Sequence, residues 1–284
     1  MGVQTTEQWP QGLWGPVTAT LDWCEANYQF SYYIAEWANS FSNISTMALA
    51  SLGAWTSWRH SLPLRYVIGG IGVWLVGLGS FAFHATLLYE AQLADELPMI
   101  YVASHSLFLL FDDRPGFDTK NRRSIFLIAA LVLFDILFTY SYYLYRNPVY
   151  HQAVFASVVL LVTIRVTIII RSSDNTARIP SDKKAVISRL FSLGVFTFAS
   201  GFLIWNLDNI FCVTITKWKK AVDWPLAFLL EGHSWWHILT GLGTYLKFVG
   251  IQYLTLCIKD DHRKYDVGRK FGLPFVKRLE IKQD

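Results

Sequence analysis

Seven apolar stretches run through this 284-residue chain, and they restrict most strongly what it can fold into. Most of them reach the length of about 20 residues that a helix needs to cross a bilayer. They cover residues 37–57, 66–88, 96–111, 124–145, 150–170, 190–214 and 226–257. Only 16% of the residues are charged, whereas about a quarter are charged in soluble domains. The sequence therefore predicts an all-α fold, a seven-transmembrane helix bundle in which residues 1–284 form a single integral-membrane domain.

Lysine and arginine are divided unevenly between the two sides of the predicted bundle. One side receives 19 of them, in residues 59–65, 112–123 and 171–189 and in the tail after 258. The other side receives four, in the N-terminal segment and in the loops 89–95, 146–149 and 215–225. Cytoplasmic loops carry the excess of positive charge in membrane proteins. We therefore expect a luminal segment over residues 1–36, seven spans within 37–257 and a cytosolic tail over 258–284.

This orientation separates the three cysteines. Cys24 and Cys212 fall on the non-cytoplasmic side, where a disulfide between them is chemically permitted, and two unpaired small hydrophobic residues are the alternative. Cys257 falls at the cytosolic end and is expected to stay a thiol. Three cysteines are too few for a disulfide scaffold. The chain also has no basic helix face, CxxC pair or glycine-rich phosphate loop, so a nucleic-acid partner is not expected.

Histidines lie at a similar depth in two of the predicted spans. The stretch EGHSWWHI places His233 and His237 four residues apart, on one helix face. His84 ends another span, one turn after Ser80, and falls in the same non-cytoplasmic half. Three imidazoles at one depth suit a tetrahedral zinc ion with an open position for water, and the nearby polar groups would support the metal or the chemistry: Ser80, Asp95, Glu96 and Asp208. The alternative is a set of hydrogen-bonded packing histidines.

A second group of polar residues precedes the first span. Asp22, Glu25, Asn27 and Glu36 offer hard oxygen ligands within fifteen residues, and such ligands suit calcium. An interfacial segment with a solvated acidic face explains the same composition. The residues alone leave both interpretations open.

Several of these motifs, taken in order, resemble the alkaline ceramidases. They are DWCEAN and EWANSFSN before and into the first span, SFAFH with the later Asp95, WNLDNIFC, and HSWWH. They extend from Asp22 to His237 and so cover nearly the whole chain. The alkaline ceramidases are seven-span enzymes of a superfamily that also includes the adiponectin and progestin receptors.

The resemblance implies a role for each matched residue. It implies that zinc is bound by His84, His233 and His237, with Ser80 and Asp95 as catalytic residues. The role of Asp208, orienting a histidine or binding the substrate headgroup, rests on its depth alone. It implies a structural calcium held by Asp22, Trp23 (through its carbonyl), Glu25, Asn27 and Glu36, and a disulfide between Cys24 and Cys212. The implied activity is hydrolysis of the ceramide amide to a sphingoid base and a fatty acid, in the membrane of the endoplasmic reticulum or Golgi and without an obligate protein partner.

Two other functions fit parts of the same pattern. A receptor of the same superfamily would use the zinc site for structure or for weak hydrolysis, but that branch is generally described with a cytosolic N-terminus, opposite to the orientation expected here. A transporter would use the intramembrane polar residues as a relay. Transporters often carry broken spans in paired halves, and no such pair is evident in this sequence.

Overall fold

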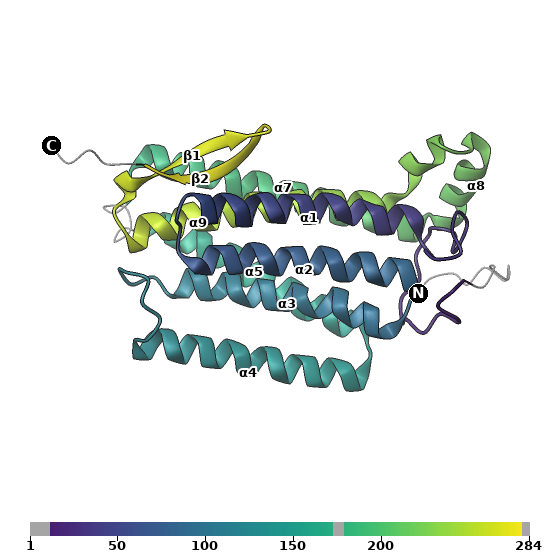
Figure 1. Ribbon diagram of the computed structural model, residues 1–284, viewed down its shortest axis with the longest axis horizontal. Helices are drawn as coiled ribbons and strands as arrows, with labels where there is room; N and C mark the ends of the chain where they lie inside the picture. Colours follow the sequence, from purple (N-terminus) through teal and green to yellow (C-terminus); the bar gives the residue numbers. More distant parts are fainter. Residues whose placement is uncertain (1–11, 173–178, 280–284) are drawn as a thin grey trace.

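Seven long helices lie side by side in this computed structural model, which describes residues 12–172 and 179–279 (Figure 1). Within those residues, the helices of 23 residues or more are α1 (Trp37–Arg59), α2 (Leu64–Thr86), α3 (Tyr89–Phe111), α4 (Arg122–Tyr145), α5 (Pro148–Arg171), α7 (Ser181–Ile210) and α9 (Gly232–Lys259). A helix of that length measures about 34 Å or more, which is enough to cross a bilayer. The mostly helical fold predicted from the sequence is confirmed.

Four of these helices are apolar enough to be candidate membrane spans by composition, namely α2, α4, α5 and α7. The other three, α1, α3 and α9, carry buried polar side chains, among them Asn39 and Asn43 in α1, Gln92 in α3 and His233 in α9. These polar residues therefore point into the bundle. Seven spans and the orientation of the chain stay predictions.

The helix bounds differ from the predicted spans in three places, the third being the stretch 226–257, in which α9 begins only at Gly232. The stretch 96–111 is the end of a longer helix, since α3 begins at Tyr89, so Asp95 lies inside the helix rather than ahead of it. The stretch 190–214 ends early: α7 stops at Ile210 and a separate amphipathic helix, α8 (Cys212–Val222), follows. Helix α8 carries the lysines of the predicted loop 215–225, and the 3₁₀ helix η1 (Leu226–Leu230) connects it to α9.

The C-terminal tail corrects the all-α prediction. After the short 3₁₀ helix η2 (His262–Lys264), strands β1 (Tyr265–Lys270) and β2 (Leu273–Arg278) form an antiparallel hairpin. Tyr265 and Val276 of this hairpin are buried in the main hydrophobic core. Each strand has only six residues, so an analysis centred on twenty-residue apolar stretches does not detect the hairpin.

Helix α9 lies at the centre of the bundle and packs against α1, α3 and α7, while α2 packs between α1 and α3. Helix α4 lies at the edge beside α3 (Figure 1). At Gly79, helices α2 and α3 lie so close together that a Cβ atom at this position would overlap the carbonyl oxygen of Ala94. This close approach brings the residue after Gly79 next to the residue after Ala94, which are Ser80 and Asp95.

A buried charge cluster fastens the ends of the helices opposite α8. Nη1 of Arg65 donates to Oδ2 of Asp112 (2.6 Å), and Nζ of Lys259 donates to the same oxygen (3.0 Å). Burial would raise the pKa of Asp112, but the hydrogen bonds from Arg65 and Lys259 outweigh it and hold the pKa below its usual value. The carboxylate therefore stays charged at neutral pH and ties α2, the end of α3 and the end of α9 together.

Candidate metal centre

Three buried histidines converge at the end of the bundle near α8. His84 comes from the last turn of α2, and His233 and His237 come from the first turns of α9; their exposed fractions are 1%, 4% and 6%. One ring nitrogen from each residue lies within 4.8 Å of the others. The Nε2 atoms of His84 and His233 are 3.3 Å apart, which is about the spacing of two ligands of a tetrahedral ion bound at roughly 2.0–2.1 Å. This group can bind a metal ion.

Polar side chains contact the Nδ1 atoms of two of the three imidazoles, on the side of each ring that faces away from the centre. Nδ1–H of His84 donates to Oε2 of Glu36 (2.5 Å). Nδ1 of His237 lies 2.7 Å from Oγ of Ser42, whose own hydrogen is donated to the carbonyl of Asn39, so His237 is the donor in this pair. Protonation at Nδ1 leaves the lone pair on Nε2, facing the centre. A carboxylate behind a histidine is a usual arrangement at metal ligands, and the Ser42 hydroxyl takes the corresponding place at His237.

The end of α2 fixes the N-terminal segment beside the histidines. The last carbonyls of a helix have no partner within it, and here the segment supplies the donors. The backbone N–H groups of Ala35 and Glu36 donate to the carbonyls of Ala85 and His84, both at 2.9 Å. Leu87 has a positive φ of 53° and ends the helix, and its carbonyl accepts from Thr18 and Ala19. These bonds hold Glu36 directly against the ring of His84.

Ser80 and Asp95 lie together next to His237. Oγ of Ser80 is 3.5 Å from Nε2 of His237, and the Ser80 hydroxyl is hydrogen-bonded to the carboxylate of Asp95. Ser80 is buried and Asp95 is partly buried. Glu96 belongs to a different group, because its carboxylate accepts from the hydroxyl of Tyr142 and from Nε2 of Gln92. The structure thus places one of the two neighbouring carboxylates, Asp95, at the histidines.

The residues of the second polar group also come together. Both oxygens of Glu25 accept from the start of α1, from the N–H of Ala38 (2.6 Å) and of Asn39 (2.8 Å), where a carboxylate favours the helix dipole. Oδ1 of Asn27 and Oε1 of Glu36 are buried without a hydrogen-bond partner among the described residues. Burial, together with the Glu231 carboxylate, raises the pKa of Glu25 to about 8. Burial likewise raises the pKa of Asp22.

A buried lysine borders this acidic cluster. Nζ of Lys219, from α8, donates to Oε2 of Glu231 (2.8 Å) and to the carbonyl of Cys24 (3.0 Å). Cys24 is paired with Cys212 as a disulfide, with a Cα–Cα distance of 5.4 Å, so α8 is joined to the N-terminal segment twice. The sequence indicated Lys219 only as one of the loop lysines and gave no sign of this contact.

Asp208 and Trp23 touch His233 from two sides. Asp208, buried in α7, accepts from the N–H of Gly232 (3.3 Å) and of His233, so it caps the first turn of α9. The indole of Trp23 stacks on the ring of His233, with centroids 4.0 Å apart and planes at 20°. Asp208 therefore holds the backbone that carries two histidines. Trp23 links the acidic cluster with the histidines, which spacing along the chain could not reveal.

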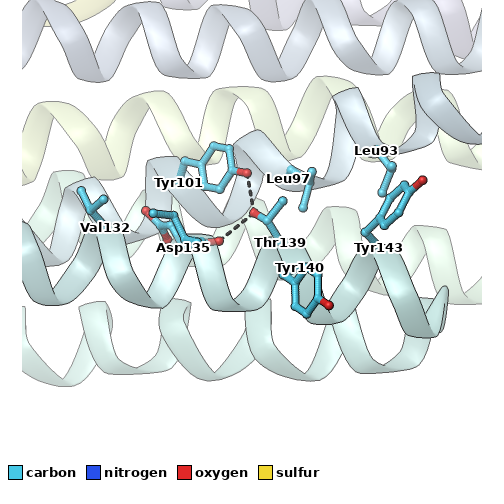
Figure 2. A pocket seen from close by; sticks show the side chains of 9 residues that line it. Leu93, Leu97, Tyr101, Val132, Asp135, Thr139, Tyr140 and Tyr143 are labelled. Carbon is cyan, nitrogen blue, oxygen red and sulfur yellow. Dashed lines mark hydrogen bonds between the residues drawn. The ribbon is translucent and has the colours of Figure 1, made fainter.

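A further hollow of the described chain lies away from the three histidines. A groove of about 560 Å³ runs between α3 and α4, and its lining is mostly apolar (Figure 2). Its polar residues include Asp135, whose carboxylate accepts from Oγ of Ser104 (2.7 Å), and Thr139, whose hydroxyl is 2.6 Å from that of Tyr101. The groove contains none of the three histidines. Asp135 is thus a second aspartate within a long helix that is paired with a serine, outside the candidate centre.

Comparison with known proteins identifies the family. The profile of the family described as ceramidase matches residues 15–277. The chain belongs to the ceramidase family. Among its relatives, mouse alkaline ceramidase 3 is 37% identical over 83% of this chain and 84% of its own length. The alkaline ceramidase YPC1 of Saccharomyces cerevisiae is 34% identical over 86% of this chain and 78% of its own length. The alkaline ceramidase of Arabidopsis thaliana is 28% identical over 82% of each.

This match confirms the resemblance seen in the sequence and the assignment of this ceramidase family member as a hydrolase. The buried histidine group is compatible with a metal-dependent enzyme. Sequence reasoning missed the polar stripe of α1, in which Asn39, Ser42 and Asn43 face α9. Their spacing of three and four residues in EWANSFSN is the signal that would have found them.

Proposed function

We propose that this protein is an intramembrane zinc-dependent amidase that hydrolyses ceramide to a sphingoid base and a free fatty acid. The observation that carries the proposal is the convergence of His84, His233 and His237 with the Ser80–Asp95 pair. A lipid amide can reach a buried site sideways from the bilayer, where a soluble substrate cannot. The similarity to alkaline ceramidases supports ceramide as the lipid.

The three histidines fit zinc better than other ions. Their Nε2 atoms face a common point, and their spacing suits a small tetrahedral cation. Zinc held there would supply a Lewis acid for the amide carbonyl and would lower the pKa of a water molecule toward ~7. Glu36 and Ser42 would hold the rings of His84 and His237 in the ligating tautomer.

Asp95 and Ser80 supply the proton transfer and the hydrogen bond that amide hydrolysis requires. The Asp95 carboxylate accepts a proton from the attacking water and returns it to the amide nitrogen as the C–N bond breaks. The Ser80 hydroxyl, freed from Asp95 when that carboxyl carries the proton, donates to the carbonyl oxygen of the substrate as negative charge develops on it. Both residues therefore act on the substrate itself, whereas Asp208 acts through the backbone of α9.

We propose that calcium occupies the acidic cluster. The unpartnered oxygens of Asn27 and Glu36 and the carboxylates of Asp22 and Glu25 are hard donors of the kind that calcium prefers. Burial raises the pKa values of Asp22, Glu25 and Glu36, and neighbouring carboxylates add to the effect at Glu25 and Glu36; a divalent cation would compensate their negative charge. Trp23 would contribute its carbonyl. Because Glu36 also bonds His84, a cation at this cluster would fix the same carboxylate that orients a histidine.

For the whole chain we propose seven spans, with residues 1–36 luminal and 258–284 cytosolic, in the endoplasmic reticulum or Golgi. The uneven division of lysine and arginine supports this orientation. The pairing of Cys24 with Cys212 supports it as well, since disulfides persist on the luminal side. Residues 280–284 of the tail lie outside the described residues.

The test of the function is release of sphingoid base from a panel of dihydro-, phyto- and unsaturated ceramides in lipid–detergent micelles, measured by mass spectrometry. We expect release from at least one ceramide by the zinc-loaded protein. If no ceramide is cleaved while zinc is bound, the amidase proposal fails and a receptor-like role in the same superfamily takes its place.

Glu36→Gln tests the link between the two polar groups. The amide keeps the shape of the side chain but removes the charge that faces Nδ1 of His84 and the acidic cluster. We expect zinc affinity to fall by about 10- to 100-fold, the usual cost of losing a partner behind a ligand. Stabilisation by calcium, measured as the rise in Tm on adding the ion, should shrink in the same variant.

The control for this variant is Asp260→Asn, which removes a carboxylate that bonds Lys264 and Tyr265 near the hairpin. Zinc affinity and the calcium effect should be unchanged in the control. An unaltered zinc affinity in Glu36→Gln would show that Glu36 does not orient His84. A wild-type Tm that calcium does not move would refute the calcium site.

A further inference from the structure

The tip of the C-terminal hairpin, residues 269–272, combines two basic side chains with an exposed aromatic ring. Phe271 is 84% exposed, and it lies between Lys270 and Gly272 at the turn joining β1 to β2. We propose that this tip enters the interface of the bilayer and binds anionic lipid headgroups. The proposal rests on the membrane-spanning arrangement proposed above and is independent of the hydrolytic reaction.

The turn places a bulky residue where the backbone disfavours one. Phe271 and Gly272 have φ values of 52° and 78°, and two positive φ values in a two-residue hairpin loop define a type I′ turn. Asn-Gly is the usual sequence, because a side chain such as phenylalanine strains this conformation. A strained and exposed Phe271 contributes little to folding. Strain that the fold retains points to a function for the side chain.

The hairpin folds back along the bundle, so that its tip lies closer to the middle of the helices than its base does (Figure 1). Nζ of Lys270 lies 3.8 Å from the ring centroid of Trp55, which is four residues before the end of α1 and so about 6 Å inside it. In β2, the carbonyl of Pro274 accepts from the hydroxyl of Tyr245, near the middle of α9 (2.7 Å). The tip therefore lies alongside the last turns of α1, inside the end of that helix rather than beyond it.

Aromatic residues mark the same depth. Trp55 is 42% and Trp58 is 70% exposed, and tryptophan is enriched where spanning helices meet the headgroups. Phe271 projects from the tip at this level. At this level the ring of Phe271 can reach the boundary between the lipid headgroups and the acyl chains. A cytosolic protein partner would have to contact Phe271 among the headgroups.

The charges of the tip match an anionic membrane surface. Arg269 is exposed, and no carboxylate pairs with Arg269 or Lys270 among the described residues. The one acidic residue of the strands, Asp266, lies near the base and pairs with Lys277 (3.4 Å). Basic side chains near the surface of an anionic leaflet gain favourable electrostatic energy. Lipids with anionic headgroups are therefore the ligand that fits this tip.

The rest of the hairpin holds the tip in place. Tyr265 and Val276 are buried in the main core, and Phe275 stacks on His60 with centroids 5.3 Å apart. Nη1 of Arg278 donates to the carbonyl of Ser61 at the end of α1 (3.3 Å). A hairpin fixed at its base by these contacts presents Phe271 at a defined depth.

The test uses an environment-sensitive fluorophore on Phe271→Cys in nanodiscs. Cys257 is buried and the other two cysteines are paired, so the label reports the introduced thiol. Quenching is measured with nitroxide lipids and with acrylamide in the water. The matched control is Arg263→Cys, at the base of the hairpin, where the side chain is 76% exposed. A second control, Leu137→Cys on the outer face of α4, is 59% exposed.

We expect lipid nitroxides to quench the label at 271 and at 137 but not at 263, and acrylamide to quench mainly at 263. In discs with anionic lipid, the label at 271 should be better protected from acrylamide quenching than in neutral discs. Lys270→Gln should reduce this protection from acrylamide by roughly fivefold. Equal acrylamide quenching at 271 and 263, with 137 quenched by lipid, would overturn the proposal alone. A label at 137 that lipid cannot quench would overturn the spanning arrangement as well.

Protection that does not depend on anionic lipid would overturn the headgroup assignment and leave an apolar anchor. Protection at 271 that appears only when a cytosolic extract is added would instead indicate a protein partner and would also overturn the proposal.

Discussion

We expect His237→Ala to lower ceramide hydrolysis by at least about a thousandfold, because a metal bound at the proposed centre would lower the barrier by several kcal/mol and each 1.36 kcal/mol is tenfold. The ring of His237 lies 4.8 Å from that of His84 and 4.6 Å from that of His233, and the other two rings are 4.9 Å apart, so the three imidazoles form a nearly equilateral group. Loss of His237 leaves two imidazoles, which bind zinc weakly. We therefore expect metal content and activity to fall together, measured by elemental analysis and by release of sphingoid base.

The control for this variant is His105→Ala. His105 is also an imidazole inside a helix, in α3, but its Nε2 donates to the carbonyl of Arg65, away from the centre. The His105→Ala variant should keep its zinc content and its activity. Full zinc occupancy in His237→Ala would show that this histidine is not a ligand. Zinc loss in both variants would indicate a general effect on folding.

Asp95→Asn should keep zinc and lose rate, by about 10²- to 10⁴-fold, the contribution expected of a group that moves a proton in the transition state. The amide can still accept a hydrogen bond from Ser80, so the helices should pack as before. It cannot take a proton from water and return it to the amide nitrogen. Turnover under substrate saturation, with metal content measured in parallel, separates the loss of chemistry from the loss of the metal.

Asp135→Asn is the matched control. Asp135 also accepts a hydrogen bond from a serine of a neighbouring helix, Ser104, but it lines the groove between α3 and α4 (Figure 2). The same change of charge at membrane depth should leave turnover unaltered there. If Asp95→Asn retains the wild-type rate, Asp95 has no part in proton transfer. If it loses zinc instead, the carboxylate has a structural role at the centre.

The arrangement around Glu36 indicates how the acidic cluster of the N-terminal segment can act on the three histidines. One oxygen of its carboxylate bonds His84, and the other faces the acidic cluster without a partner among the described residues. Lys219, which borders the same cluster and is 8% exposed, donates from Nζ to Glu231. A cation bound at the cluster would therefore change the field at His84 through a single side chain.

The local sequence determined the broad features of this protein. Apolar stretches predicted long helices, and the helix period put Ser80 with His84 and His233 with His237. Counting residues along two of the stretches placed the three histidines at one depth. These inferences depend only on the rise and period of a helix, which every residue shares. The family resemblance rested on the same motifs and was confirmed by comparison.

Tertiary structure alone decided which polar groups meet. The contact of Glu36 with His84 needs the N-terminal segment to bond the free carbonyls at the end of α2, and the contact of Ser42 with His237 needs one particular rotation of α1 against α9. The hairpin also escaped prediction, because its strands are short and stabilised by burial against α1 and α9. Local periodicity states which residues share a face, but the packing of side chains far apart in the sequence decides what that face touches.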